Sequence, residues 1–367
     1  MNPKLSPTVS VIRNSSSMLE FFLSGIRQQV HIKVENDLIE RIVCSLDGTR
    51  TVEQLCSEYE TSAEDMNNLL NFLRSKGVLD NSLPHEDFYE YERFRRVIHF
   101  LAEYSSSHEH LLSMWKNINS STVLVIGLGA VGTWTACNLA QSGVCNIILM
   151  DDDVVDITNL HRQFGFTQAD TGRFKTDVIA ERLLKYNPDI NVTSSKTQLQ
   201  EGSLEIFNDV NIDLIINCAD QPTVDMTSLL TGQYAMSRAI PHIIGGGYNL
   251  HLSLIGQTVI PGKSACVKCF EKTLDELNKI DPDKVKKLMV KNRKIGSFGP
   301  MCSLIASMIS MEAIKVLSRE IQPSNVNRRG EFDIYTMDIT YKEFPRRDDC
   351  EWCSKQGLYY QNFTEKK

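Results

Sequence analysis

One short stretch limits the possible folds of this chain more than any other. Residues 122–132 read "TVLVIGLGAVG", in which an apolar run typical of a buried strand leads into Gly127, Gly129 and Gly132. This spacing permits a tight turn and lets a phosphate approach the N-terminus of the following helix. The stretch predicts a strand, a glycine loop and a helix that bind a nucleotide. By itself it fits a plain NAD site equally well.

Strand and helix patterns continue to alternate after the glycine loop. "NIILM" and "DLIINCAD" contain further apolar strands, and helical spacing covers residues 174–186. This alternation predicts an α/β fold with a doubly wound, mostly parallel Rossmann-like sheet, which we assign to residues 84–367. Residues 1–83 read instead as three short strands and three helices, which predicts a small winged-helix-like α+β domain.

Charge and composition narrow the possible partners. The chain carries 39 Lys and Arg against 46 Asp and Glu, a formal net charge of −7. This balance argues against a nucleic-acid partner held by a basic surface. The N-terminus lacks the pattern of a signal peptide, and no apolar run is expected to reach the length of a membrane span. We therefore expect no membrane partner and a cytoplasmic location.

An acidic stretch after the second strand favours ATP over NAD. It reads "DDDVVDITNLHRQ", and Asp151, its first residue, is placed to bind the ribose hydroxyls. An NAD site needs no guanidinium, whereas Arg162 and Lys175 suit a polyphosphate, because Arg offers a fork of donors and Lys a point charge. Asp220 ends a later strand, where a carboxylate can hold Mg²⁺. Any one of these residues alone also fits an ordinary charged surface.

Two cysteine pairs late in the chain have the spacing of metal ligands. Cys266 and Cys269 form one CxxC pair, and Cys350 and Cys353 form the other. Four thiolates are a set that zinc prefers, and a closed shell of four ligands makes the site structural. The alternative is a pair of redox dithiols or two unmetallated pairs.

These motifs together resemble the ThiF/MoeB/E1-like adenylating superfamily over roughly residues 90–355. The resemblance rests on "GLGAVG", "DDDVVDITNLHRQ", "GRFK", the "NP" at 187–188 and "CAD", in this order. It implies a homodimer that uses ATP and Mg²⁺ to form an acyl adenylate and pyrophosphate. It assigns the ribose to Asp151, the phosphates to Asn159, Arg162 and Lys175, and Mg²⁺ to Asp220; we add Asp153 and Gln163 as expected nucleotide contacts.

The resemblance also implies an arginine supplied by the partner subunit. The family places it in an "R-Y-x-R" stretch before the glycine loop, which here reads Arg93-Phe94-Arg95-Arg96. Arg96 is the expected catalytic residue, with Arg95 as the alternative. Relatives that transfer the acyl group to a thiol carry a cysteine beyond the first CxxC pair, and residues 270–300 contain none. We expect Cys302 to be a core residue and the adenylate to react with a nucleophile on the substrate.

The N-terminal domain resembles the PqqD-like peptide-recognition domains. A free sheet edge beside a helix accepts an extended leader peptide as an added strand; the alternative is a winged helix that only packs or dimerises. The domain order is similar to that of the microcin C-type adenylating enzymes. Within that group the chain is similar to the pantocin A-type enzymes, which implies activation of a glutamate, ring closure with a neighbouring glutamate and decarboxylation.

The leading hypothesis is therefore an adenylating enzyme acting on a ribosomally made precursor peptide. The alternatives are activation of a ubiquitin-like or sulfur-carrier C-terminus and a non-catalytic nucleotide-binding scaffold. Two further segments are weaker candidates for substrate contact: the glycine-rich turn at 245–251 and the basic run at 284–294.

Overall fold

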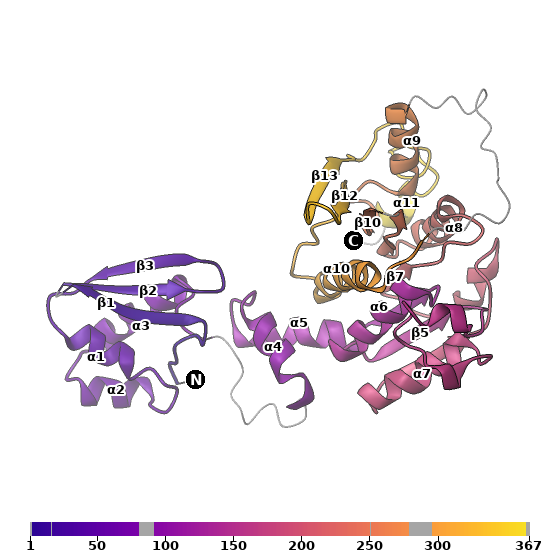
Figure 1. Cartoon of the computed structure of the whole chain (residues 1–367). Helices are drawn as coiled ribbons and strands as arrows, with labels where there is room; N and C mark the ends of the chain where they lie inside the picture. Colours follow the sequence, from indigo (N-terminus) through magenta and orange to yellow (C-terminus); the bar gives the residue numbers. More distant parts are fainter. Residues whose placement is uncertain (1, 16, 81–91, 250, 279–295, 365–367) are drawn as a thin grey trace. The chain divides into compact units, whose positions relative to one another are not determined.

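The computed structural model describes residues 2–15, 17–80, 92–249, 251–278 and 296–364. The chain forms two compact units, Met1–Leu112 and Ser113–Lys367 (Figure 1). The boundary expected at residues 83 and 84 and the basic run at 284–294 lie outside the described residues.

The first unit begins with a small antiparallel sheet in the order β1-β2-β3. Its strands are β1 (Val9–Ser15), β2 (Met18–Leu23) and β3 (Gln28–Lys33), and α1 (Leu38–Cys44), α2 (Val52–Glu58), α3 (Ala63–Ser75) and α4 (Arg95–Ala102) follow. The side chains of Thr51 and Ser62 accept backbone N–H groups at the starts of α2 and α3. Leu19 and Phe21 of β2 are fully buried in a core with Leu55 and Leu73. This arrangement confirms the α+β character expected of the N-terminal segment.

The second unit is built on a six-stranded sheet in the order β11-β8-β7-β4-β5-β6. All neighbours pair in parallel except β8 and β11. The strands are β4 (Thr122–Ile126), β5 (Asn146–Met150), β6 (Asn191–Ser195), β7 (Leu214–Asn217), β8 (His242–Ile244) and β11 (Gln257–Val259). Apolar residues fill β4 and β7 continuously because both faces of such a sheet are covered. The expected doubly wound, mostly parallel sheet is thus confirmed.

The helices of this unit connect and cover the sheet (Figure 1). They are α6 (Ala130–Gln141), α7 (Lys175–Tyr186), α8 (Val224–Ser237), α9 (Val267–Asn278), α10 (Gly299–Ser318) and α11 (Tyr360–Thr364), preceded by α5 (His108–Ser120), which begins in the first unit and ends in the second. The chain passes from β4 to β5 and β6 on one side and to β7 and β8 on the other. The loops after β4, β5 and β7 therefore meet at the carboxyl edge of the sheet, where ligands bind in folds of this kind.

A second, antiparallel sheet was not anticipated. It has the order β13-β12-β10-β9, with β9 (Tyr248–Asn249), β10 (Leu252–Ile255), β12 (Arg328–Asp333) and β13 (Asp338–Glu343). The turn expected at 245–251 therefore contains a strand that pairs with β10. Two residues are too few for a period-2 pattern, and the pairing of β10 with β12 joins segments that lie far apart in the sequence.

The expectation that no apolar run is long enough to span a membrane is wrong by length and composition. Helix α10 has 20 residues with a mean hydropathy of 1.5, so it is long enough and apolar enough to cross a membrane. Within the fold, 56% of this apolar window is buried, and the helix packs against α6 and β10. Cys302, near its start, is fully buried, as expected for a core residue.

Candidate functional site

The glycine loop joins β4 to α6 and holds its three glycines for different reasons. Gly127 has φ +82°, and a Cβ there would lie 2.6 Å from the backbone nitrogen of Ala219. A Cβ on Gly132 would overlap the carbonyl oxygen of Gly127. Gly129, at the N-terminus of α6, has an extended backbone, and a Cβ there would meet no atom within 4 Å. The packing of the protein therefore requires Gly127 and Gly132 and leaves the space at Gly129 open.

Asp151 follows β5 directly and binds back to the glycine loop. Its Oδ2 accepts the backbone N–H of Leu128 at 2.5 Å, and its Oδ1 accepts that of Asp153 at 2.8 Å. Burial raises the pKa of this carboxyl, and the neighbouring Lys175 ammonium acts in the opposite direction. The carboxylate thus stands beside the opening at Gly129, at the strand end where a ribose ligand was expected.

Lys175 is the first residue of α7 and reaches back toward the same edge. Its side chain is only 6% exposed, and its Nζ lies 2.6 Å from Oδ2 of Asp153. Its backbone N–H also donates to the carbonyl oxygen of Asp153 at 3.0 Å. Asp153, expected as a nucleotide contact, is therefore paired with Lys175 in this structure.

Asn159, Arg162 and Gln163 lie in and after a short 3₁₀ turn, Ile157–Asn159. The side-chain oxygen of Asn159 accepts the backbone N–H of Asp156 at 3.1 Å, which leaves its amide group to point elsewhere. Arg162 is part-exposed and donates to the carbonyl oxygen of Thr158 at 3.0 Å. Gln163 is 3% exposed, and its Oε1 has no hydrogen-bond partner among the described residues.

Asp220 lies in the loop after β7, next to the residue that Gly127 contacts. The Cys218 N–H donates to the carbonyl oxygen of Ile126 at 2.7 Å, which fixes this loop beside the glycine loop. Asp220 itself is exposed. Arg96 and Arg95 belong to α4 in the first unit.

Two more segments contribute to this edge: the sequence offered the first only as a weak candidate and gave no indication of the second. The Gly245 N–H donates to the carbonyl oxygen of Asn217 at 2.5 Å, so the glycine-rich segment after β8 lies beside the end of β7. A Cβ on Gly299, at the start of α10, would lie 3.1 Å from the carbonyl oxygen of His161. The only local signal for this second contact was the Gly-Pro pair that opens α10, which marks a helix start without indicating its neighbour.

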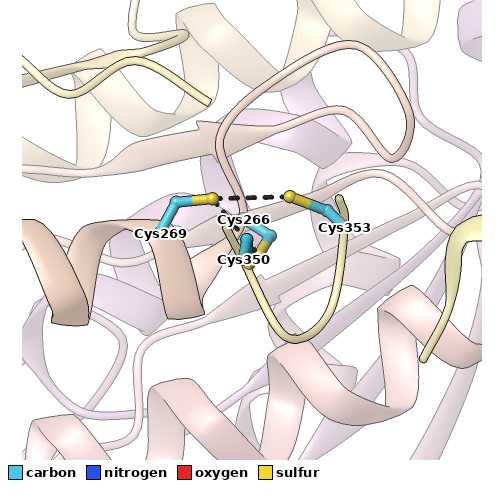
Figure 2. A group of neighbouring side chains, drawn as sticks. All are labelled: Cys266, Cys269, Cys350 and Cys353. Carbon is cyan, nitrogen blue, oxygen red and sulfur yellow. Dashed lines mark hydrogen bonds between the residues drawn. The ribbon is translucent and has the colours of Figure 1, made fainter. Parts of the chain in front are cut away.

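The four cysteines of the two CxxC pairs come together in one buried cluster (Figure 2). The sulfurs of Cys266 and Cys350 are 3.4 Å apart, those of Cys269 and Cys353 are 3.4 Å apart, and those of Cys266 and Cys269 are 3.8 Å apart. A tetrahedral zinc with four bonds of about 2.3 Å requires sulfurs about 3.8 Å apart, whereas a disulfide requires about 2 Å. The sulfur spacing fits zinc, and all four cysteines are free thiols in this structure, so the alternatives of redox dithiols and of unmetallated pairs stay open.

Hydrogen bonds among the sulfurs distribute protons unevenly in the cluster. The contact with Cys266 is the main cause that lowers the pKa of Cys269 to about 7. The same kind of contact lowers the pKa of Cys350 further, while the pKa values of Cys266 and Cys353 are raised. Thiolate is the form that binds metal, and lowered pKa values at Cys269 and Cys350 favour that form.

Comparison with known proteins gives matches over most of the chain. The ThiF family profile matches residues 107–353, well over half of the chain. The adenylyltransferase and sulfurtransferase UBA4 of Vanderwaltozyma polyspora is 27% identical over 285 residues, which cover 72% of this chain and 57% of UBA4. The chain thus spans little more than half the length of this curated relative.

Two solved structures have a similar fold over nearly the whole chain. Escherichia coli MccB with ATP matches with a TM-score of 0.73 and 24% identity, covering 96% of this chain and 100% of MccB. PaaA matches with a TM-score of 0.70 and 19% identity, covering 93% of this chain and 99% of PaaA. At these identities the likeness establishes the fold alone. With the extent of the profile match, the glycine loop and the residues around it identify the chain as a member of the ThiF family.

Proposed function

We propose that this protein is an ATP-dependent adenylyltransferase that activates a carboxylate of a ribosomally made precursor peptide. The observation that carries the proposal is the open space at Gly129. No packing within the described residues explains a glycine there, whereas a phosphate approaching the N-terminus of α6 does. Asp151 and Lys175 converge on this same edge of the sheet.

The residues around the opening divide into three proposed roles. Asp151 holds the ribose hydroxyls, because its carboxylate is fixed by two backbone N–H groups. Lys175 and Arg162 bind the phosphates, with Asn159 and Gln163 supplying amide groups. Asp220 is an exposed carboxylate beside the glycine loop and suits Mg²⁺, which neutralises phosphate charge when bound.

In this reaction the peptide carboxylate attacks the α-phosphate of ATP, and pyrophosphate leaves. The protein contributes position and positive charge, which are worth most where charge develops in the transition state. We propose that the protein is a cytoplasmic homodimer in which Arg96 of one subunit reaches the nucleotide site of the other. We propose that the four-cysteine cluster holds structural zinc, since its sulfur spacing fits that ion.

The proposed substrate rests on the first unit and on one structural relative. MccB is described as the microcin C7 biosynthetic enzyme, and its structure includes a complex with N-formylated MccA. In the first unit, β3 pairs with β2 without a break in register, and its other edge meets no further strand among the described residues. A register shift between Arg13 and Ser15 interrupts β1. We therefore propose that β3 receives the leader peptide as an added strand.

The finer proposal is that the activated group is a glutamate that closes a ring with its neighbour, as in pantocin A-type chemistry. Activation of a ubiquitin-like or sulfur-carrier C-terminus is a second candidate, favoured by 30% identity over 198 residues to the sulfur carrier protein ThiS adenylyltransferase of Escherichia coli. A non-catalytic nucleotide-binding scaffold is a poorer candidate, because Arg162, Lys175 and Asp220, the residues suited to phosphates and Mg²⁺, are all present together.

Mass spectrometry and ATP–pyrophosphate exchange test these proposals. Incubated with ATP and the short peptide encoded beside its gene, the protein should release AMP and change the mass of the peptide. Arg162→Ala and Asp220→Asn should each lower exchange by on the order of 10²-fold, the usual cost of one lost charge contact in the transition state. A peptide with the reacting acid changed to its amide should bind and yield no AMP. Full exchange in both variants, or ADP as the only product, would contradict adenylation.

A further inference from the structure

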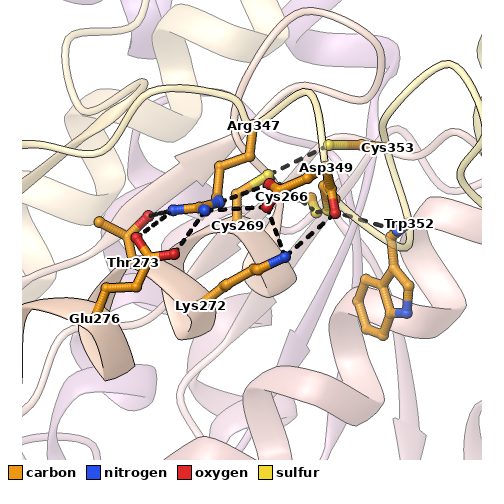
Figure 3. A network of polar contacts seen from close by, with 10 residues as sticks. Cys266, Cys269, Lys272, Thr273, Glu276, Arg347, Asp349, Trp352 and Cys353 are labelled. Carbon is orange, nitrogen blue, oxygen red and sulfur yellow. Dashed lines mark hydrogen bonds and ion pairs between the residues drawn. The ribbon is translucent and has the colours of Figure 1, made fainter. Parts of the chain in front are cut away.

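A network of ion pairs lies next to the cysteine cluster and joins the same two segments (Figure 3). Arg347 donates from two nitrogens to the two carboxylate oxygens of Glu276, both at 2.7 Å. The same guanidinium donates to Asp349 at 2.9 and 3.2 Å. Lys272 completes the network with its Nζ 2.7 Å from Asp349. We call these four residues the ion clasp.

The clasp and the metal ligands share one face of α9. Cys269, Lys272, Thr273 and Glu276 follow at the i, i+3, i+4 and i+7 spacing that places side chains on one side of a helix. On the opposite segment, Arg347 and Asp349 directly precede Cys350. Each side of the ion clasp therefore lies within a few residues of a cysteine of the cluster. When the ion pairs form, they hold the two cysteine pairs at a fixed distance from each other.

The distance along the chain explains why such a device matters. Cys266 and Cys350 are 84 positions apart, so a metal that joined them unaided would have to close a long loop. Contacts that hold the ends together beforehand remove part of that entropic cost from metal binding. Stacking of Phe270 on Phe344, with ring centroids 4.7 Å apart, joins the same two segments.

Arg347 is suited to this task by its geometry more than by its charge. It is the least exposed member of the clasp, with a side chain 20% exposed, against 57% for Glu276 and 53% for Asp349. Single exposed ion pairs contribute little to stability. A planar fork that binds two carboxylates at once also fixes the direction of both, which a lysine in its place would not do.

We propose that Arg347 is a positioning residue that aligns the Cys350–Cys353 pair with the Cys266–Cys269 pair before zinc binds. The clasp then raises the affinity of the site without supplying a ligand. Losses of residues that support metal ligands commonly lower metal affinity by about 10- to 100-fold. This inference rests on the proposed zinc site.

The test is the rate at which zinc leaves the full-length protein into an excess of a chromophoric chelator. We expect Arg347→Gln and Glu276→Gln to accelerate release by about 10- to 100-fold and Arg347→Lys to lie between these and wild type. The double variant should release zinc no faster than Arg347→Gln alone, because removing Arg347 already breaks the link to Glu276. Arg329→Gln is the matched control, since Arg329 is similarly exposed and pairs with Glu331 at 3.6 Å on β12. We expect it to stay within about twofold of wild type.

Cobalt(II) in place of zinc separates positioning from loss of the ligand set. The Arg347→Gln variant should keep the absorption bands of a tetrahedral thiolate site, because all four cysteines remain. If Arg347→Gln fails to fold, the zinc release rate and cobalt bands of Arg347→Lys are compared with those of wild type and Arg329→Gln instead. Release at the rate of the Arg329→Gln control would overturn the inference, and so would loss of the cobalt bands. A wild-type protein that holds no zinc would overturn both this inference and the proposed zinc site.

Discussion

Gly127 and Gly129 lie two residues apart, and the structure predicts different effects on stability when each is changed to alanine. Gly129 has φ −71° and ψ −159°, a conformation that alanine adopts freely, and its Cβ would meet nothing within 4 Å. Alanine stiffens the unfolded chain and is a weaker helix cap than glycine, two small effects of opposite sign. We expect the free energy of unfolding of Gly129→Ala to stay within about 1 kcal/mol of wild type.

At Gly127 the same methyl group meets the protein itself. A left-handed backbone costs an alanine about 1–2 kcal/mol. Its Cβ would lie 2.6 Å from the backbone nitrogen of Ala219, and overpacking of this kind costs about 1–3 kcal/mol more. We expect Gly127→Ala to lower the free energy of unfolding by about 2–5 kcal/mol, a large part of a typical total of about 5–15 kcal/mol.

Gly129→Ala, which should keep its stability, should lose ATP–pyrophosphate exchange. The methyl group of Gly129→Ala occupies the space through which a phosphate reaches the N-terminus of α6. Misplacement of a reacting group by about 1 Å can cost on the order of 10²-fold in rate. We therefore expect a stable Gly129→Ala protein with ATP–pyrophosphate exchange lowered by at least that factor and weak ATP binding in calorimetry. A stable variant with wild-type exchange would refute the placement of the phosphates at Gly129.

Two further predictions follow from buried charged or titratable groups. Asp153→Asn removes the partner of the nearly buried Lys175 ammonium and should cost about 1–3 kcal/mol of stability, between the values for an exposed and a buried pair. Saturating ATP should raise its melting temperature more than that of wild type, because phosphate replaces the lost acid; the exposed Asp152→Asn is the control, and equal shifts would contradict this role. His242 is fully buried in β8, and burial lowers its pKa to about 4 from 6.5, so the folded protein holds it neutral. Its contribution to stability is complete above pH 6.5 and falls by about 3 kcal/mol as the pH drops to 4, because the unfolded chain takes up a proton that the folded chain does not. In chemical denaturation, the free energy of unfolding of His242→Leu should fall less than that of wild type between pH 6.5 and 4. An equal fall in both proteins would disprove this source of acid sensitivity.

Local rules were sufficient for many elements of this fold. Thr51 and Ser62 have the local sequence pattern of helix caps, and in the structure their side chains accept the backbone N–H groups of Gln54 and Asp65. The glycine loop between an apolar strand and a helix could likewise be recognised from its own residues, although the close approach of Gly127 to the distant Ala219 could not.

Features that depend on distant partners could not be predicted in the same way. The pairing of Asp153 with Lys175 depends on how β5 and α7 pack, and sequence spacing does not determine the direction of either side chain. Two cysteine pairs indicate a metal, but nothing in their spacing identifies Arg347 and Glu276 as the contact that aligns them. The apolar length of α10 was underestimated because Glu312 and Lys315 interrupt its apolar residues, although the average over the helix remains apolar.

The surroundings of the cysteines bear on how the proposed adenylate is consumed. A thioester relay needs an accessible thiolate near the nucleotide site. Four of the ten cysteines belong to the proposed zinc site, and Cys44 and Cys56 belong to the first unit. Cys218 adjoins the glycine loop, but burial raises the pKa of its thiol to about 12, and burial raises that of Cys137 to about 11.

The remaining two cysteines are no better suited to a relay. Cys302 is fully buried in α10, and Cys145 precedes β5 at the amino edge of the sheet, opposite the glycine loop. No sulfur in the second unit is thus both accessible and easily deprotonated at the carboxyl edge, although the site can hold a phosphate there. This arrangement supports the proposal that a nucleophile of the peptide itself attacks the acyl adenylate and that AMP is released in the same step.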